Sequence, residues 1–173
     1  MTRRQNHYEV AFETYLHRHG IAVLAVDETK RPSHYGQKLK NLDCVVFSQR
    51  DQIPWLVDVK GRQFTSSKRW LNWIKEEELT VFAEWEQLFG WPYKVLFVFA
   101  YHVIGSFSPV SKEQLFFSQG RYYAFVGIPL SSYQPHAKQV SESWQTVALP
   151  RERFCQLARP IHYFLEKREM TVA

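Results

Sequence analysis

Two acids and a lysine interrupt apolar segments of this sequence, at positions where a strand would begin or end. The segment 42–62 reads LDCVVFSQRDQIPWLVDVKGR. Asp43 opens its first apolar run, and Asp58-Val59-Lys60 closes the second. Neighbouring side chains of a strand point to opposite faces of a sheet, so Asp58 and Lys60 would share one face. If the two runs pair as a hairpin, Asp43 comes close to Asp58, because one begins its strand and the other ends it.

Paired acids of this kind suggest a metal site. Two carboxylates at the end of an apolar sheet repel each other unless a cation lies between them. Hard oxygen ligands suit Mg²⁺ or Mn²⁺. An isolated Asp-x-Lys is more often a pair of solvated charges. Here the apolar flanks, the acid at Asp43 and an acidic helix upstream favour the catalytic interpretation.

The upstream helix carries Glu9 and Glu13. These residues are four apart and so lie on one helix face. For at least one of them a solvated surface position is the simpler interpretation. Glu9 is the preferred third ligand of the metal or of its water, and Glu13 is the second choice.

Basic residues lie on both sides of the proposed centre. Between Lys60 and Lys75 there are five basic residues, no acid and three large aromatics. Cations contact phosphates and exposed aromatics stack on bases, although a solvated loop with core aromatics fits this pattern equally well. The candidate nucleic-acid-binding residues are Lys30, Arg31, Lys38, Lys40, Arg62, Gln63, Lys68 and Arg69.

The composition agrees with a globular chain that binds a polyanion. The 173 residues carry a net charge of +5 and have a pI near 9.2, which favours an anionic partner. Two cysteines are too few for a disulfide framework. No run approaches the roughly 20 apolar residues that a membrane span needs. We therefore expect one cytoplasmic domain over 1–173 and no membrane partner.

The elements that would position these residues follow a simple order. Asn6 as a cap and Gly20 as a stop predict a first helix up to about residue 19. Three acids followed by helical spacing predict a second helix that Gly90 ends. Apolar runs predict strands over 21–26, 42–47, 54–60, 94–101 and 121–128. We expect loops over 27–41 and 129–145, and short helices after Pro150 and over 161–167. This order, α-β-β-β-α-β in its core, predicts a mixed α/β fold with helices on a central sheet.

With these residues in place, the sequence resembles the PD-(D/E)xK nuclease superfamily, which has a restriction-endonuclease-like fold. In that pattern a helix bears Glu, and successive strands bear Asp and then Asp/Glu-x-Lys, here Glu9, Asp43 and Asp58-Val59-Lys60. The likeness is strongest to archaeal Holliday-junction resolvases and small RecB-like nucleases, whose first helix also ends in Gly. The spacing from Glu9 to Gly20 resembles theirs, which favours Glu9 over Glu13.

The resemblance is confined to the first part of the chain and is imperfect. It implies a core over about 6–101, and nothing in the extension 102–173 is recognisable. Leu42 stands where the motif commonly has proline. The long segment 27–41 ahead of Asp43 leaves the choice of substrate open.

The resemblance implies an Mg²⁺- or Mn²⁺-dependent hydrolysis of phosphodiester bonds, with DNA as the expected substrate. Asp43, Asp58 and the Val59 carbonyl would hold the cation, which polarises the phosphate. Lys60 would orient or help deprotonate the attacking water. Since resolvase-like proteins tend to be dimers, a homodimer is expected, although no dimer face is identifiable. Two other functions stay open: a non-catalytic basic nucleic-acid-binding module on the same fold, and a protein-interaction domain with an aromatic surface.

Overall fold

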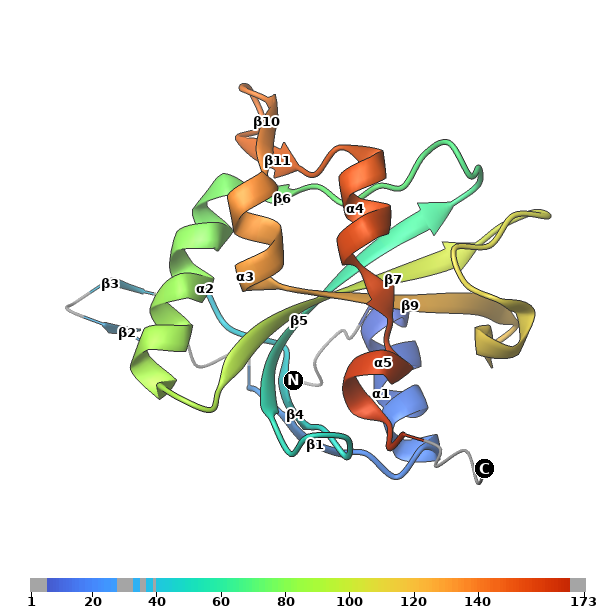
Figure 1. The fold of residues 1–173 in the computed structure, drawn as a ribbon, viewed down its shortest axis with the longest axis horizontal. Coiled ribbons are helices and arrows are strands. Elements are labelled where there is room, and N and C mark those ends of the chain that lie inside the picture. The colour runs from blue at the N-terminus through green and yellow to red at the C-terminus, as the bar shows by residue number, and fades with distance from the viewer. Residues whose placement is uncertain (1–5, 28–32, 35–36, 39, 169–173) are drawn as a thin grey trace.

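A curled sheet with helices on both faces forms the body of the molecule (Figure 1). The structure is a computed structural model that describes residues 6–27, 33–34, 37–38 and 40–168. Its helices are α1 (His7–Arg18), α2 (Glu76–Phe89), α3 (Leu130–Tyr133), α4 (Arg151–Leu157) and α5 (His162–Leu165), with 3₁₀ turns η1 (Lys112–Gln114) and η2 (Gln134–His136).

The main sheet is mixed, as the order of the elements predicts. Its strands are β1 (Ala22–Ala25), β4 (Cys44–Phe47), β5 (Pro54–Phe64), β7 (Lys94–Val103), β8 (Phe116–Ser118), β9 (Arg121–Pro129) and β12 (Arg159–Pro160). Within the described residues the order is β1-β4-β5-β7-β9-β12, and β8 pairs with the first residues of β9. The central pair β5–β7 is parallel and its neighbours are antiparallel. A parallel pair needs a crossover, which α2 supplies.

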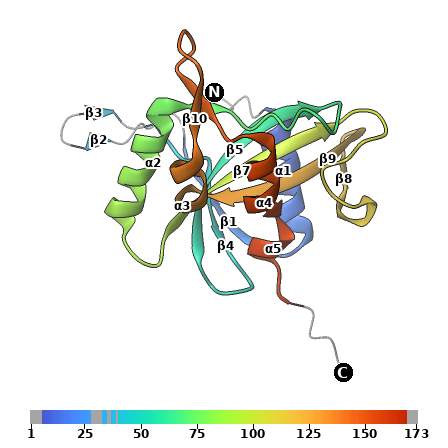
Figure 2. The ribbon, with the colours of Figure 1, turned by 45° about the horizontal axis from the view of Figure 1, so that its top comes forward.

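Two smaller sheets lie beside the main one. A three-stranded sheet has the order β10 (Lys138–Ser141), β11 (Thr146–Ala148) and β6 (Ile74–Lys75). Its β10–β11 hairpin projects from the body, as the tilted view in Figure 2 shows. The strands β2 (Ser33–His34) and β3 (Gln37–Lys38) pair with each other.

Each face of the main sheet has its own apolar core. On one face α1 and α5 pack through Phe12, Leu16 and Phe164 against Val57 and Val98. On the other face α2, α3 and α4 pack against the alternate residues of the same strands, as the apolar runs of β5 and β7 predict for a sheet buried on both sides. None of the helices in the described part of the chain is long and apolar enough to cross a membrane.

The two helices that flank the proposed centre begin and end as the sequence predicts. The Asn6 side chain accepts hydrogen bonds from the backbone N–H groups of Tyr8 and Glu9, which fixes the start of α1. Gly20 and Gly90 follow α1 and α2 with positive φ angles of 62° and 70°, which glycine adopts without steric cost.

Several predicted boundaries were wrong. β5 does not end at Lys60 but continues to Phe64, because β7 keeps pairing with it up to Val103. The predicted loop 129–145 contains α3, η2 and β10. There Tyr133 is buried and its hydroxyl donates to the carbonyls of Asn72 and Val147. The helix is therefore held by tertiary contacts that its polar sequence does not reveal.

Part of the predicted loop 27–41 lies outside the described residues. Lys30 and Arg31 fall there, and the side chain of Lys38 is also not described. Within this segment the structure shows the short β2–β3 ladder in place of continuous loop.

Candidate active site

The predicted acids and lysine line a pocket of about 680 Å³ beside β5 and the first turns of α2. Its lining residues that carry charge or lie in the motif are Glu9, Lys40, Asp43, Asp58, Val59, Lys60, Lys75, Glu77 and Glu78. The helices α1 and α2 and the strand β5 therefore all contribute to one site.

Asp43 lies where β4 and β5 separate. The strand ladder ends at the Cys44–Val57 pair, and the Asp43 N–H still donates to the Val57 carbonyl at 3.0 Å. The Val59 N–H of β5 donates to Asp43 Oδ2 at 2.6 Å. The carboxylate therefore continues the ladder in place of a strand residue, and this fixes its position.

The surroundings of Asp43 disfavour its charged form. Burial raises the pKa of Asp43 to about 8, and the charges of Asp58 and Glu9 act in the same direction. The hydrogen bond from Val59 and the charge of Lys60 oppose the rise without cancelling it. A cation in the pocket would favour the ionised carboxylate.

Asp58 and Lys60 share the face of β5 that points toward α2, as the strand alternation predicts. Their side chains are 3% and 10% exposed, and Lys60 Nζ lies 2.6 Å from Asp58 Oδ2. The same ammonium donates to Glu78 Oε1 at 2.9 Å. Lys60 is therefore held between two buried carboxylates.

Glu78 is a site residue that the sequence reasoning missed, because it treated Glu76, Glu77 and Glu78 alike as helix-dipole partners. The first two are exposed, whereas Glu78 is buried. Burial opposes its ionisation, but Lys60 and Lys40 outweigh that effect and lower the pKa of Glu78. Its place four residues before the buried Phe82 was the available signal, because i and i+4 share a helix face.

Lys40 also reaches into this pocket. Its Nζ lies 3.4 Å from Asp58 Oδ1 and forms a short ion pair with Glu78. Its side chain is 42% exposed. Of the basic residues proposed to bind nucleic acid, Lys40 thus lies directly beside the acids.

The two acids of α1 take different places. Glu9 lines the pocket and accepts a hydrogen bond from the Asn6 side chain. Glu13 lies one turn further along, beside a smaller adjoining cavity, and is 3.6 Å from His17 Nε2. Of the two acids, only Glu9 lines the larger pocket, and its preference as a ligand stays a prediction.

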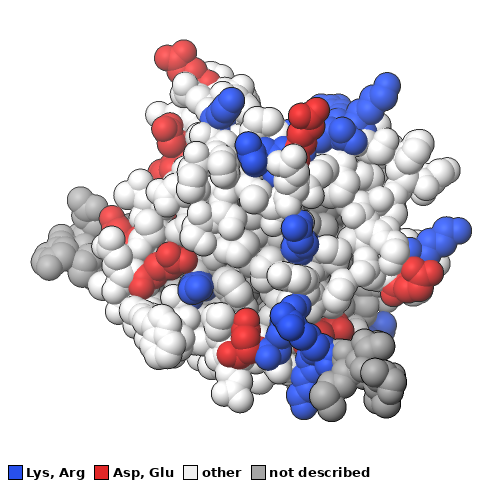
Figure 3. Space-filling view, viewed as in Figure 1, with Lys and Arg blue, Asp and Glu red and all other residues white. Residues whose placement is uncertain are grey.

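Arg62, Gln63, Lys68 and Arg69, which follow the motif, do not line the pocket. The Arg62 guanidinium stacks 3.8 Å from the centre of the Trp73 ring and donates to the Gly61 and Trp73 carbonyls. Gln63, Lys68 and Arg69 are exposed. Figure 3 shows lysine and arginine side chains gathered over the segment between β5 and β6 and the start of α4.

The aromatic residues of this segment divide between core and surface. Phe64 is fully buried, whereas Trp73 is 40% exposed. Trp70 packs against Phe64 and Tyr101. Among these three, Trp73 is the side chain best placed to meet a base, and Arg62 already covers one side of its ring.

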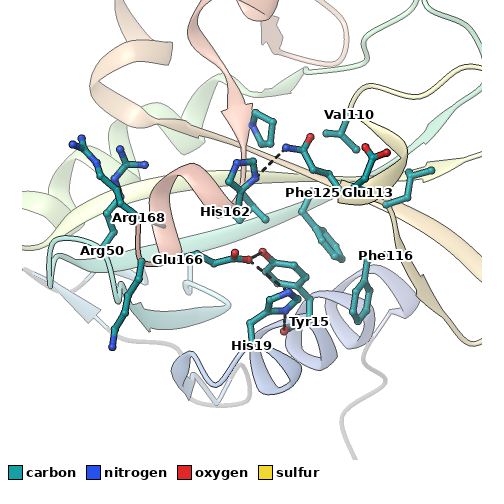
Figure 4. A pocket seen from close by; sticks show the side chains of 15 residues that line it. Tyr15, His19, Arg50, Val110, Glu113, Phe116, Phe125, His162, Glu166 and Arg168 are labelled. Carbon is teal, nitrogen blue, oxygen red and sulfur yellow. Dashed lines mark hydrogen bonds and ion pairs between the residues drawn. The ribbon is translucent and has the colours of Figure 1, made fainter. Parts of the chain in front are cut away.

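A second pocket, of about 630 Å³, lies beside α1 and α5 (Figure 4). Tyr15 donates to Glu166 there, and His19 Nε2 lies 3.6 Å from the same carboxylate. On another side of the pocket, the side chains of Gln114 and His162 contact each other. Since Asp43, Asp58 and Lys60 lie elsewhere, this pocket is separate from the predicted chemistry.

The donor chemistry of the first pocket fits a hard divalent cation. In the described part of the chain no three His, Cys, Asp or Glu side chains come together as a metal cluster. Mg²⁺ does not require such a cluster, because it keeps several waters and is commonly held by one or two carboxylates. Asp43 and Asp58 supply two carboxylates, and Val59, whose N–H donates to Asp43, also lines the pocket.

The similarity of this chain to a known protein is seen in its structure and not in its sequence. No family model matches the chain, and no curated protein matches it in sequence. The structure is similar to that of Hjc from Archaeoglobus fulgidus, a Holliday junction resolvase of an archaeal hyperthermophile. The TM-score is 0.53 with 12% identity, and the match covers 90% of this chain and 95% of that one.

The chain has a resolvase-like fold. The predicted likeness to the restriction-endonuclease-like fold is therefore confirmed. A match that covers 90% of the chain also extends beyond residue 101, where the sequence shows no resemblance. The resolvase-like fold thus includes elements from the C-terminal extension.

Proposed function

We propose that this protein is an Mg²⁺- or Mn²⁺-dependent nuclease that hydrolyses phosphodiester bonds of DNA. The observation that carries the proposal is the shared pocket of Asp43, Asp58 and Lys60. Three features of the pocket support it: a buried and a half-buried carboxylate, a lysine fixed between acids, and an opening to solvent through which a phosphate can enter.

Asp43 and Asp58, with the Val59 carbonyl, are the proposed ligands of the cation. When bound, the cation would polarise the scissile phosphate and make its water more acidic. Asp43 is held by the Val59 N–H, and Asp58 by Lys60, so each carboxylate is already positioned before the cation arrives. Such preorganisation lowers the cost of stabilising charge during the reaction.

Lys60 is the proposed group that orients the attacking water. Its ammonium is fixed by Asp58 and Glu78 and is nearly buried. It can therefore donate a hydrogen bond in a defined direction without losing side-chain entropy at that step. Glu9, which lines the pocket from α1, is a proposed further ligand of the cation or of its water.

DNA is the proposed substrate for two reasons. The net charge of +5 favours a polyanion, and the structurally similar Hjc is a Holliday junction resolvase. A module that only bound nucleic acid would gain nothing from carboxylates such as Asp43, Asp58 and Glu9 clustered in one pocket. The homodimer expected from the resemblance remains a prediction that sedimentation equilibrium tests.

The experiment incubates the full chain with supercoiled plasmid, linear duplex and a four-way DNA junction, in Mg²⁺, Mn²⁺ or EDTA. We expect cleavage with either metal and none in EDTA. Salt-sensitive binding without cleavage would favour the non-catalytic binding module. Neither binding nor cleavage would favour a protein-interaction domain.

A further inference from the structure

Lys40 is attached to one face of α2 through three contacts. The Trp85 indole N–H donates to the Lys40 carbonyl at 2.9 Å. The Lys40 ammonium lies 5.5 Å from the centre of the Phe82 ring and pairs with Glu78. Glu78, Phe82 and Trp85 recur at i, i+4 and i+7, so one helical stripe positions both ends of this residue.

Four alternating charges meet at the end of this stripe. Asp58 and Glu78 each contact both Lys40 and Lys60. Neither carboxylate is left uncompensated, and neither lysine relies on a single partner. The charge of the buried acids is therefore balanced by the protein itself.

The two lysines differ in how firmly they hold Asp58. Lys60 is 10% exposed and approaches Asp58 Oδ2 to 2.6 Å. Lys40 is 42% exposed and is 3.4 Å from Asp58 Oδ1. A longer ion pair that is open to water is the weaker of the two. The contact between Lys40 and Asp58 is therefore the one that a competing cation breaks first.

We propose that Lys40 is the resident counter-ion of Asp58, which a divalent cation displaces and which then binds a phosphate of the DNA. This inference rests on the proposed function. After displacement, Trp85 still holds the Lys40 backbone and Glu78 still attracts its ammonium. The side chain therefore stays at the mouth of the pocket, where an incoming phosphate meets it.

The first test measures Mn²⁺ affinity of the full chain by isothermal titration calorimetry. Removing one directly competing ammonium with Lys40→Ala should tighten Mn²⁺ binding about tenfold. Lys75→Ala is the matched control, because Lys75 lines the same pocket with an exposed side chain while its backbone N–H donates to Glu78. It removes the same charge from the pocket rim and should change the affinity by only about twofold.

A second variant leaves every charge in place. Trp85→Phe removes the hydrogen bond to the Lys40 carbonyl but keeps an aromatic ring. It should loosen Lys40 and tighten Mn²⁺ binding by about threefold, in the same direction as Lys40→Ala. A purely structural role for Trp85 would lower stability without raising Mn²⁺ affinity.

The phosphate contact is tested by DNA binding in EDTA and in Ca²⁺, used as a probe cation. In EDTA the acids engage Lys40, so Lys40→Ala should leave the affinity within about twofold. In Ca²⁺ the freed ammonium contacts DNA, and the same variant should weaken binding about tenfold. Lys75→Ala should have the same effect under both conditions.

The outcomes separate this inference from the proposed function. The wild type could bind Mn²⁺ while neither Lys40→Ala nor Trp85→Phe binds it more tightly. In that case the counter-ion role of Lys40 is wrong and the nuclease proposal stands. An equal effect of Lys40→Ala on DNA binding in EDTA and in Ca²⁺ would also overturn it. If the wild type binds no Mn²⁺, the proposed function and this inference fail together.

Discussion

Asp43 and Asp58 share one pocket, but the protein stabilises their charges differently. Asp58 faces two ammonium groups, those of Lys60 and Lys40. Asp43 accepts a hydrogen bond from the Val59 N–H, but burial, together with the charges of Asp58 and Glu9, raises its pKa. Asp43 is therefore the carboxyl group whose charge depends most on a bound cation.

This difference predicts a pH-dependent stability in EDTA. The pKa of Asp43 rises from 3.8 to about 8 on folding, first through burial and then through Asp58. A carboxyl group whose pKa is raised by folding contributes its full stability at pH values below its pKa in the unfolded state. That contribution is lost as the pH rises through its pKa in the folded state. Asp43→Asn abolishes this titration and keeps an acceptor for the Val59 N–H.

Urea denaturation at pH 5 and pH 8.5 measures the effect. Relative to the wild type, Asp43→Asn should gain about 4 kcal/mol in unfolding free energy between these two pH values. Asp51→Asn, at an exposed turn, is the control and should show no such gain. A difference between wild type and Asp43→Asn that does not change with pH would mean that Asp43 ionises normally.

The residues at the centre were partly predictable from the sequence. Asp43, Asp58 and Lys60 interrupt apolar strands, and strand alternation places the last two on one face. Glu78 was missed because exposed and buried acids look alike in an EEE run. Which acid turns inward depends on how α2 is rotated against β5, and only packing decides that.

The contact between α1 and β5 sets how closely Glu9 approaches the acids on the sheet. Gly61 lies under the ring of Tyr8, and a Cβ at this position would be 2.1 Å from that ring. A side chain here would push the start of α1 away from β5. Glu9 follows Tyr8 directly, so it would move with the helix.

Gly61→Ala should therefore destabilise the protein by about 1–3 kcal/mol, the usual cost of overpacking. The check is a double-mutant cycle with Tyr8→Ala, which removes the ring that the new methyl group meets. In that background the cost of Gly61→Ala should largely disappear. If the cost is the same in both backgrounds, the close approach of Tyr8 does not explain the glycine.

Long elements were predictable because their periodicity is local. α1, α2, β5, β7 and β9 each carry an apolar pattern or a cap that their own residues define. The short strands β6, β11 and β12 have two or three residues and exist through pairing with segments far along the chain, β6 with β11 and β12 with β9. No local pattern specifies such pairing, so the sequence did not indicate these strands.

The distribution of charge over the molecule gives a prediction about DNA binding. Lys68 and Arg69 are exposed on the segment between β5 and β6, outside the pocket. If this segment borders the bound DNA, the double variant Lys68→Ala/Arg69→Ala should bind DNA more weakly. The slope of log affinity against log salt should fall by about two, because two fewer counterions are released.

Lys94→Ala is the control. Lys94 is exposed at the start of β7 and lies beside Trp55, whereas Lys60 of the pocket lies beside Phe99, further along the same strand. It should leave both affinity and slope unchanged. An unchanged slope for the Lys68/Arg69 variant would show that this segment faces away from DNA.

The most direct test of the proposed nuclease activity is the rate of plasmid nicking in Mg²⁺ by wild type, Asp58→Asn and Lys60→Ala. The first variant removes the charge that would hold the cation, and the second removes the group that would orient the water. Each should lose about a hundredfold or more in rate, the cost of removing a main electrostatic contribution to catalysis.

Purification of Asp51→Asn in parallel controls for contaminating nuclease, and this variant should retain the wild-type rate. Asp58→Asn should stay folded, because Glu78 still pairs with both lysines, and Mn²⁺ should raise the melting temperature of the wild type but not of this variant. We expect nicking that requires Mg²⁺, Asp58 and Lys60 together. Nicking by Asp58→Asn at the wild-type rate would contradict it, as would an Asp58→Asn chain that unfolds while the wild type does not respond to Mn²⁺.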